Sequence, residues 1–129
     1  MSDTIKKPTH YRLVSVMRAI GPYLRESQCE EGAYLFDCLS VCVDDKKSPE
    51  KREFWGWWLE LNLQDGVFQA RYRTGLYDVT GDWQEKSIPK KVVEDVNRTQ
   101  VAFHDKLVET LKSQFALEVQ MHEESVEFV

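Results

Sequence analysis

The sequence predicts an α+β domain in which a four-stranded antiparallel sheet packs against a short N-terminal helix and a long C-terminal helix. Apolar residues recur at helical spacing toward both ends of the chain, and the stretch between them is rich in aromatic and β-branched residues, which favour strands. The predicted strands follow one another with no helix between them, which is typical of an antiparallel sheet. At 129 residues the chain has the size of one domain, so we expect residues 1–129 to form a single domain.

The first predicted element is a helix from Thr9 to about Ile20. Its apolar residues are spaced three or four positions apart: Leu13, Val14, Val16, Met17 and Ile20. Thr9 can cap the first turn, and Gly21-Pro22 stops the helix. Tyr23 follows this stop, so we expect its ring to emerge at a rigid corner.

Residues 34–43 form the first predicted strand. Leu35, Asp37, Leu39, Val41 and Val43 fall on one face, opposite Tyr34, Phe36, Cys38, Ser40 and Cys42. Both faces are largely apolar, which predicts a central strand. Asp37 is the exception, and a carboxylate there needs either a hydrogen-bonded partner or access to water.

Residues 54–63 and 67–74 predict a hairpin around Gln64-Asp65-Gly66, where glycine can adopt a positive φ. The alternating Trp55, Trp57, Leu59, Leu61 and Leu63 predict a core-facing side. Glu60 can pair with Arg71 or Arg73 across the hairpin. A turn at residues 79–82 then leads to a short edge strand near Trp83.

The longest predicted helix spans about residues 89–114 and opens at Pro89. Its apolar stripe consists of Val92, Val96, Phe103, Leu107 and Leu111. Residues 115–119 either extend this helix or add a short strand. The acidic residues from Glu118 onward suggest a solvated end.

Composition narrows the function classes. The net charge of −5 disfavours general binding to the phosphate backbone of nucleic acid. No apolar run is long enough to cross a membrane, and the first residues lack the apolar segment of a signal peptide, so we expect a cytoplasmic protein. The three cysteines are expected to be free thiols. We find no catalytic motif, no metal-ligand set and no cofactor-binding loop, and we therefore expect no enzyme activity and no cofactor.

The run Arg52-Glu53-Phe54-Trp55-Gly56-Trp57-Trp58 contains three of the four tryptophans. An aromatic sheet face with Arg71 and Arg73 beside it can stack single-stranded nucleic acid, although the acidic charge balance opposes this. Aromatic residues and arginine are also the types enriched at protein-binding hot spots, where arginine grips a carboxylate and the rings exclude water. From the pattern alone, core packing and a protein interface are about equally favoured.

Several segments closely resemble the Crl family of sigma-factor-binding transcription regulators, a family linked to curli genes. They are residues 21–26, 29–30, 36–43, 49–58, 75–78 and 81–83. The resemblance covers roughly residues 12–115 and keeps their order and spacing. It implies a transcription activator that binds the stationary-phase sigma factor, sigma S, and promotes its assembly with core RNA polymerase without binding DNA itself.

The resemblance also implies a partner surface. It assigns contacts with sigma domain 2, including an acidic Asp-Pro-Glu motif, to Tyr23, Arg52, Phe54 and Trp57, with the Pro49 loop beside them. A monomer is expected, and contact with core polymerase is left open. Strict strand alternation sends Phe54 and Trp57 to opposite faces, so placing both on one surface requires a bulge or bend at Gly56. In this interpretation Trp55 and Trp58 pack the domain.

Overall fold

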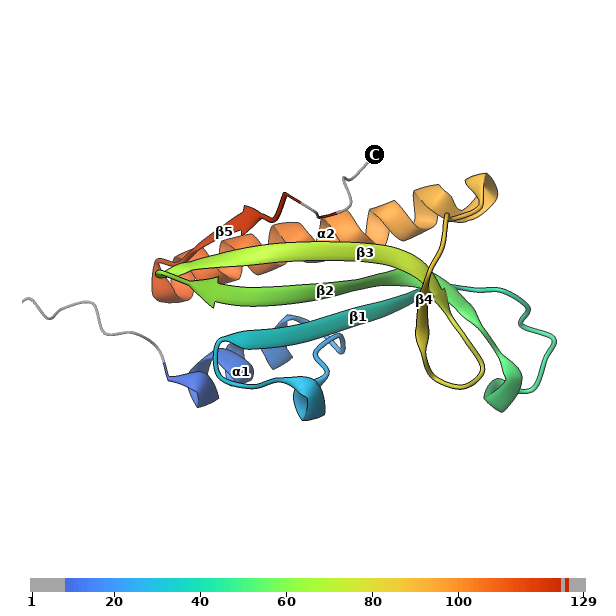
Figure 1. The fold of residues 1–129 in the computed structure, drawn as a ribbon, viewed down its shortest axis with the longest axis horizontal. Helices are drawn as coiled ribbons and strands as arrows, with labels where there is room; N and C mark the ends of the chain where they lie inside the picture. Colours follow the sequence, from blue (N-terminus) through green and yellow to red (C-terminus); the bar gives the residue numbers. More distant parts are fainter. Residues whose placement is uncertain (1–8, 124, 126–129) are drawn as a thin grey trace, which may run out of the picture.

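The computed structural model describes residues 9–123 and residue 125 (Figure 1). The main elements are α1 (His10–Ile20), β1 (Ala33–Cys42), β2 (Phe54–Gln64), β3 (Val67–Tyr77), β4 (Trp83–Glu85), α2 (Lys90–Phe115) and β5 (Glu118–Met121). Short 3-10 turns lie at Glu26–Gln28 and Pro49–Lys51. The α+β class and the two helices are confirmed, and none of the helices described is long and apolar enough to cross a membrane.

The sheet has five strands rather than the four predicted. Strands β1, β2, β3 and β4 follow one another as antiparallel neighbours, and β5 pairs in parallel with β3. The outer edge of β3 is shared, since β5 pairs with Val67–Ala70 and β4 with Gly75–Tyr77. Ala116 ends α2 in the left-handed conformation (φ 55°), and this turn brings the chain back to the sheet. Residues 118–121 therefore form a short strand, which was one of the two predicted alternatives for this segment, whereas residues 124 and 126–129 of the predicted solvated end lie outside the described part.

Strand β1 lies at the edge of the sheet, so the prediction of a central strand is wrong. The segment after α1 covers part of this edge. The backbone N–H of Arg25 donates to the carbonyl of Leu35 at 2.8 Å, and the N–H of Asp37 donates to the carbonyl of Tyr23 at 2.9 Å. This short pairing satisfies backbone groups that an edge strand otherwise leaves open.

Among the described strand pairings there is one bulge, and it lies in β1 rather than at Gly56. Leu39 pairs with Gly56 and Val41 with Trp55, so Ser40 is the extra residue. Beyond it Val41 packs against the core, and the predicted alternation fails from this point. The pairing of β2 with β3 runs unbroken from Phe54 to Gln64.

The core fills the space between one face of the sheet and both helices. Figure 1 shows α2 running along the length of the sheet. The buried apolar residues are Leu13, Met17, Ile20, Tyr34, Phe36, Cys38, Trp57, Leu59, Leu61, Phe68, Ala70, Tyr72, Val96, Phe103, Leu107 and Leu111. The predicted tryptophan-leucine side of β2 and most of the predicted α2 stripe are thus confirmed as core.

The opposite face of the sheet, which we call the open face, carries half-buried polar and aromatic side chains. The ladder positions of this face include Leu35, Glu60 and Arg71 in one row and Asp37, Trp58 and Arg73 in the next. Arg73 Nε lies 3.3 Å from Glu60 Oε1, which confirms the predicted pairing of Glu60 with an arginine across the hairpin.

Candidate partner-binding surface

Two connections leave the sheet at the same end. Cys42, Phe54 and Tyr77 are paired across β1, β2 and β3, and the chain turns away from the sheet just beyond this row. Figure 1 shows the β1–β2 and β3–β4 connections close to each other at this end. We call residues 43–53 and 78–82 the loop end.

Arg52 organises the β1–β2 connection. Its Nε donates to the carbonyl of Lys47 at 2.8 Å and its Nη2 to the carbonyl of Asp45 at 2.9 Å. Its backbone N–H donates to the carbonyl of Pro49 at 3.3 Å. The fixed φ of Pro49 suits the first position of the 3-10 turn. The guanidinium of Arg52 is therefore held by its own loop, while Nη1 makes no hydrogen bond or ion pair within the described residues and is free for an outside carboxylate.

Phe54 begins β2 on the open face, where further aromatic rings follow. The rings of Trp58 and Trp83 lie 4.8 Å apart, and those of Tyr77 and Trp83 lie 5.3 Å apart. We call Phe54, Trp58, Tyr77 and Trp83 the open-face aromatics. Trp58 thus packs against another ring outside the core, whereas Trp55 packs against the core from its margin.

Two paired glycines make room for this arrangement. A Cβ at Gly56 would lie 1.9 Å from the carbonyl oxygen of Cys38 and 3.1 Å from Cη2 of Trp83. A Cβ at its ladder partner Gly75 would lie 2.0 Å from the carbonyl oxygen of Gln84. Gly56 is therefore needed for close approach of β1 and Trp83, and the predicted bend that would bring Phe54 and Trp57 to one face is absent.

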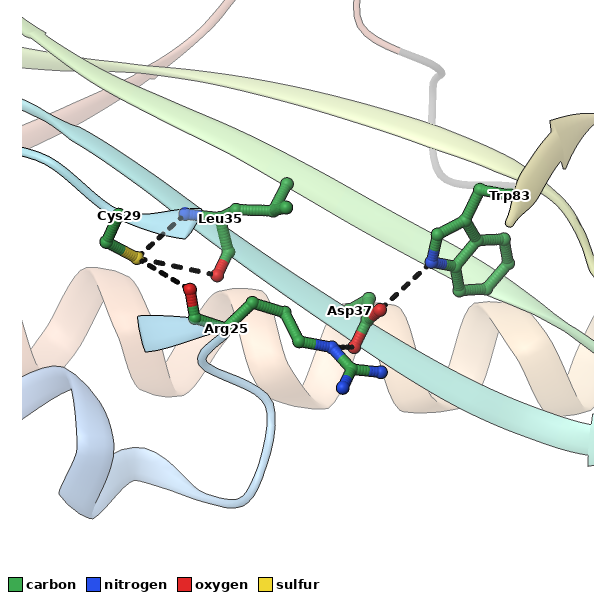
Figure 2. A network of polar contacts seen from close by, with 5 residues as sticks. All are labelled: Arg25, Cys29, Leu35, Asp37 and Trp83. Atoms are coloured by element: carbon green, nitrogen blue, oxygen red, sulfur yellow. Dashed lines mark hydrogen bonds and ion pairs between the residues drawn. The ribbon is translucent and has the colours of Figure 1, made fainter. Parts of the chain in front are cut away.

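The carboxylate of Asp37 accepts hydrogen bonds from Trp83 and Arg25 and so links both residues to β1. Trp83 Nε1 donates to Asp37 Oδ2 at 2.9 Å, and Arg25 Nε donates to Asp37 Oδ1 at 2.7 Å (Figure 2). The hydrogen bond to Asp37 raises the pKa of Arg25 above its ordinary value. Asp37 is only 7% exposed, so two donors replace water around its carboxylate. The predicted need for a partner at this position is met, and the two contacts join β4 and the Tyr23–Arg25 segment.

Cys29 lies beside this network. Its Sγ is within 3.2 Å of the carbonyl of Arg25, and the N–H of Leu35 lies 3.4 Å from the same sulfur (Figure 2). Burial raises the pKa of the Cys29 thiol, which disfavours the reactive thiolate. We therefore assign this cysteine a packing role.

Tyr23 is half-buried and belongs to the core side of the sheet. Its ring centroid lies 5.9 Å from Trp57 and 5.4 Å from Phe103. The carbonyl of Tyr23 accepts a hydrogen bond from the N–H of Asp37, which lies five positions along β1 from the Cys42–Phe54 pair. At about 3.3 Å per residue, Tyr23 and Phe54 are separated by roughly 16 Å along the strand.

Trp57 lies in the core, so in this structure its ring is not on the surface where the partner contact is expected. The residue is 0% exposed, and its Nε1 donates to Thr99 Oγ1 at 3.0 Å. Its ring lies 4.9 Å from Phe103 and 5.7 Å from Tyr72. The cause is the unbroken alternation of β2, which turns residue 57 inward when residue 54 points outward.

The structure therefore brings together only part of the predicted site. Pro49, Arg52 and Phe54 are neighbours at the loop end, while Tyr23 reaches the surface elsewhere and touches Trp57 from outside. Arg25 and Trp83 also belong to this region, although no local sequence signal assigns them to it. The unusual carboxylate at position 37 was the available signal, but its partners are 12 and 46 positions away along the chain.

Within the described residues, no group of three or more His, Cys, Asp or Glu side chains is placed to hold a metal ion. The carboxylate of Asp78 is instead used to build the β3–β4 turn. It accepts hydrogen bonds from the hydroxyl of Thr80 at 2.5 Å, from the N–H groups of Asp82 and Thr80 at 3.1 and 3.0 Å, and from Nε2 of Gln84 at 2.5 Å. These bonds lower the pKa of Asp78.

Comparison with known proteins gives one consistent family. A family model described as "Sigma factor-binding transcriptional regulator Crl" matches residues 1–129. The sigma factor-binding protein Crl of Vibrio vulnificus (strain YJ016) is 58% identical over 129 residues, covering 100% of both chains. The protein of the same name from Vibrio cholerae O395 is 54% identical over 128 residues, covering 99% of each. That of Photobacterium profundum is 44% identical over 128 residues, covering 99% of this chain and 96% of the relative.

Proposed function

Because this chain belongs to the Crl family of sigma factor-binding transcriptional regulators, we propose that it binds the stationary-phase sigma factor, sigma S, and promotes the assembly of sigma S with core RNA polymerase. In this proposal it acts as a transcription activator in the cytoplasm. It is a monomer with no enzyme activity and no cofactor, and it does not bind DNA itself.

The main support is full-length similarity to relatives that carry the name sigma factor-binding protein. The loop end adds a chemical argument. Arg52 has one edge of its guanidinium available, the exposed Pro49 lies in the same loop, and the half-buried Phe54 begins the strand two positions further on. An arginine that its own loop already orients loses little conformational entropy when it binds a carboxylate, such as one in domain 2 of the sigma factor.

We assign the contacts to Pro49, Arg52 and Phe54 at the loop end and to Tyr23 on the core side of β1. Trp57 takes a supporting role, because it is buried and the ring of Tyr23 packs against it. A partner that touches both places has to wrap around the edge of β1 beyond the stretch that the Tyr23–Arg25 segment covers.

Promotion of assembly requires only linked binding. If this protein prefers the conformation of sigma S that binds core polymerase, the apparent affinity of sigma S for core rises by the ratio of the two affinities. A coupling of about 1 to 3 kcal/mol raises that affinity by roughly 5- to 150-fold.

The direct test is calorimetric titration of the purified protein with purified sigma S, with the housekeeping sigma factor as control. We expect saturable binding to sigma S alone. Equal binding to both sigma factors, or to neither, would contradict the proposed specificity. Acceleration of holoenzyme assembly at limiting sigma S tests the activating step.

Arg52→Ala tests the assignment of the surface. Losing a charge-assisted contact at an interface costs about 2 kcal/mol or more, so we expect sigma S affinity to fall about 30-fold or further. The melting temperature should change little, because the side chain bonds only two loop carbonyls. Lys51→Ala, an exposed neighbour, is the matched control, and unchanged affinity of Arg52→Ala would exclude the charge contact.

Single-stranded nucleic-acid binding remains the competing hypothesis. The aromatic face it needs is partly used internally, since Trp57 is buried and Trp58 packs on Trp83. A gel shift with labelled single strands and no sigma factor separates the two, and clear salt-sensitive binding would favour the rival.

A further inference from the structure

A groove of about 730 Å³ lies at the end of the sheet opposite the loop end. It is bounded by the start of α1, the beginning of β1, the β2–β3 turn and the segment that follows α2. In Figure 1 these parts meet at the left side of the sheet. None of Tyr23, Pro49, Arg52, Phe54 and Trp57 lines it.

The floor of the groove is apolar and firmly held. Leu13 and Tyr34 are core residues, and Leu63 and Leu117 pack against the core from its margin. His10 stacks on Tyr34 with ring centroids 5.5 Å apart, and its Nδ1 lies 3.1 Å from the hydroxyl of Tyr34. The floor is thus already formed, and binding there costs little reorganisation.

The rim offers an exposed ring and open backbone. Tyr11 is 85% exposed, the largest exposure among the exposed large hydrophobic residues described. Gly32 and Gly66 lie in the two turns beside the groove, and nothing comes within 4 Å of a Cβ built at either. A peptide backbone can therefore approach closely at both turns.

The groove is lined by carboxylates and by no lysine or arginine among the described residues. The carboxylates are those of Glu31 and Asp65, and both residues are exposed. The nearby Arg12 lies over the ring of Phe115, 5.6 Å from its centroid. Two carboxylates beside an apolar floor disfavour nucleic acid and favour a cationic ligand with an apolar side chain.

We propose that this groove binds a peptide segment of a partner protein in which an aliphatic or aromatic side chain is flanked by lysine or arginine. The apolar side chain occupies the floor between Leu63 and Leu117, and the flanking cations face Glu31 and Asp65. A second copy of this chain is a poorer occupant, because each copy carries a net charge of −5. The groove lets the protein hold a second partner while the loop end remains available.

The test is an NMR titration of the ¹⁵N-labelled full chain with the synthetic peptide acetyl-Lys-Lys-Leu-Phe-Lys-Arg-amide. One control peptide has Glu at every basic position and another has Ser in place of Leu-Phe. We expect saturable shifts at the amides of Gly32, Leu63, Gly66 and Leu117 with the basic apolar peptide only. Absence of saturation at millimolar peptide, equal shifts with either control, or shifts confined to the loop end would overturn the proposal.

Variants test separately the exposed ring of Tyr11 and the two carboxylates of Glu31 and Asp65. Tyr11→Ser should weaken peptide binding about threefold to tenfold without affecting the fold, because the side chain is almost fully exposed. The pair Glu31→Gln and Asp65→Asn should weaken it about fivefold and reduce its salt dependence. Glu109→Gln on α2 is the matched control. Unchanged affinity in the double variant would remove the charge argument.

A photo-crosslinking residue at position 11 of the full chain identifies the occupant. Crosslinks that form only with the added basic peptide support the proposal. Crosslinks to residues 1–8 of the same chain, or to a second copy, that the peptide does not displace would overturn it. Sigma S affinity should be unchanged in Tyr11→Ser, so this test is independent of the loop end.

Discussion

Replacing Trp57 with phenylalanine separates a structural role for this residue from a direct contact with the partner. Phenylalanine keeps an aromatic ring beside Phe103 and Tyr72 but removes the indole N–H and part of the ring volume. Since Trp57 is fully buried, we expect the change to reduce stability and leave the partner surface almost unaltered.

The size of the loss follows from two contributions. The Nε1–H to Thr99 hydrogen bond contributes about 0.5 to 1.5 kcal/mol, and the lower end applies because Thr99 Oγ1 keeps its contacts with Ser40 and the carbonyl of Val96. Removing roughly 40 Å³ of ring costs about 1 kcal/mol as a cavity and about 1 kcal/mol more as lost transfer free energy. The sum is about 2.5 kcal/mol, which lowers the melting temperature of a domain of this size by about 10 °C.

Urea unfolding and sigma S titration at 20 °C, each on the same protein preparation, provide the measurement. We expect a stability loss of about 2.5 kcal/mol and a change in affinity below about threefold, since a domain with ordinary stability stays folded after that loss. Parent-like stability combined with a tenfold loss of affinity would refute the reasoning, because it would mean that Trp57 contacts sigma S directly.

The remaining predictions concern other parts of the fold. Gln100 is buried in the apolar stripe of α2, and its amide has no hydrogen-bond partner among the described residues. Gln100→Met should therefore raise the free energy of unfolding, measured in urea, by about 1 to 2 kcal/mol. A destabilised variant would contradict this. Gly56→Ala should lower the free energy of unfolding by roughly 3 kcal/mol, because the new Cβ meets the carbonyl of Cys38. Gly66→Ala has open space around its Cβ and should lower it by about 1 kcal/mol through the positive φ alone. Equal losses in the two variants would argue against the close approach at Gly56. Hydrogen bonds lower the pKa of Asp78 in the folded state. The stability that this carboxylate gives the β3–β4 turn is therefore complete above the ordinary Asp pKa of about 3.9 and is lost as pH falls through the lower folded pKa. A pH titration followed by NMR at the amide of Thr80 with a midpoint at or above about 3.9 would be inconsistent with this.

The features that the sequence predicted correctly depend on neighbours along the chain. Thr9 caps α1, with its side chain accepting from the N–H of Arg12, and Pro89 precedes α2, so both helices begin close to where their local signals indicate. The β2–β3 turn has positive φ at both Asp65 and Gly66, as expected for a two-residue hairpin.

The features that were missed depend on contacts between distant residues. The bulge at Ser40 coincides with a 2.7 Å hydrogen bond between the hydroxyls of Ser40 and Thr99, which is 59 positions away. The sequence left open whether residues 115–119 extend α2 or form a short strand, because the turn into β5 depends on a left-handed alanine at position 116 and alanine carries no signal for that conformation. The pairing of Asp37 with Trp83 joins β1 to β4 only once the sheet has formed.

At Trp57, strand alternation and the family resemblance predict different environments for the side chain. Strand alternation placed it in the core, whereas the family resemblance placed it with Phe54 on one surface, and the structure follows the alternation. The two can be reconciled if the resemblance reflects a need for Trp57 without direct contact. Its buried ring supports Tyr23 on one side of the sheet, and three positions earlier the same strand presents Phe54 on the other. A partner surface divided between two faces keeps a fixed geometry only if a rigid element joins them, and a tryptophan held by Thr99, Phe103 and Tyr72 provides that connection at low entropic cost on binding.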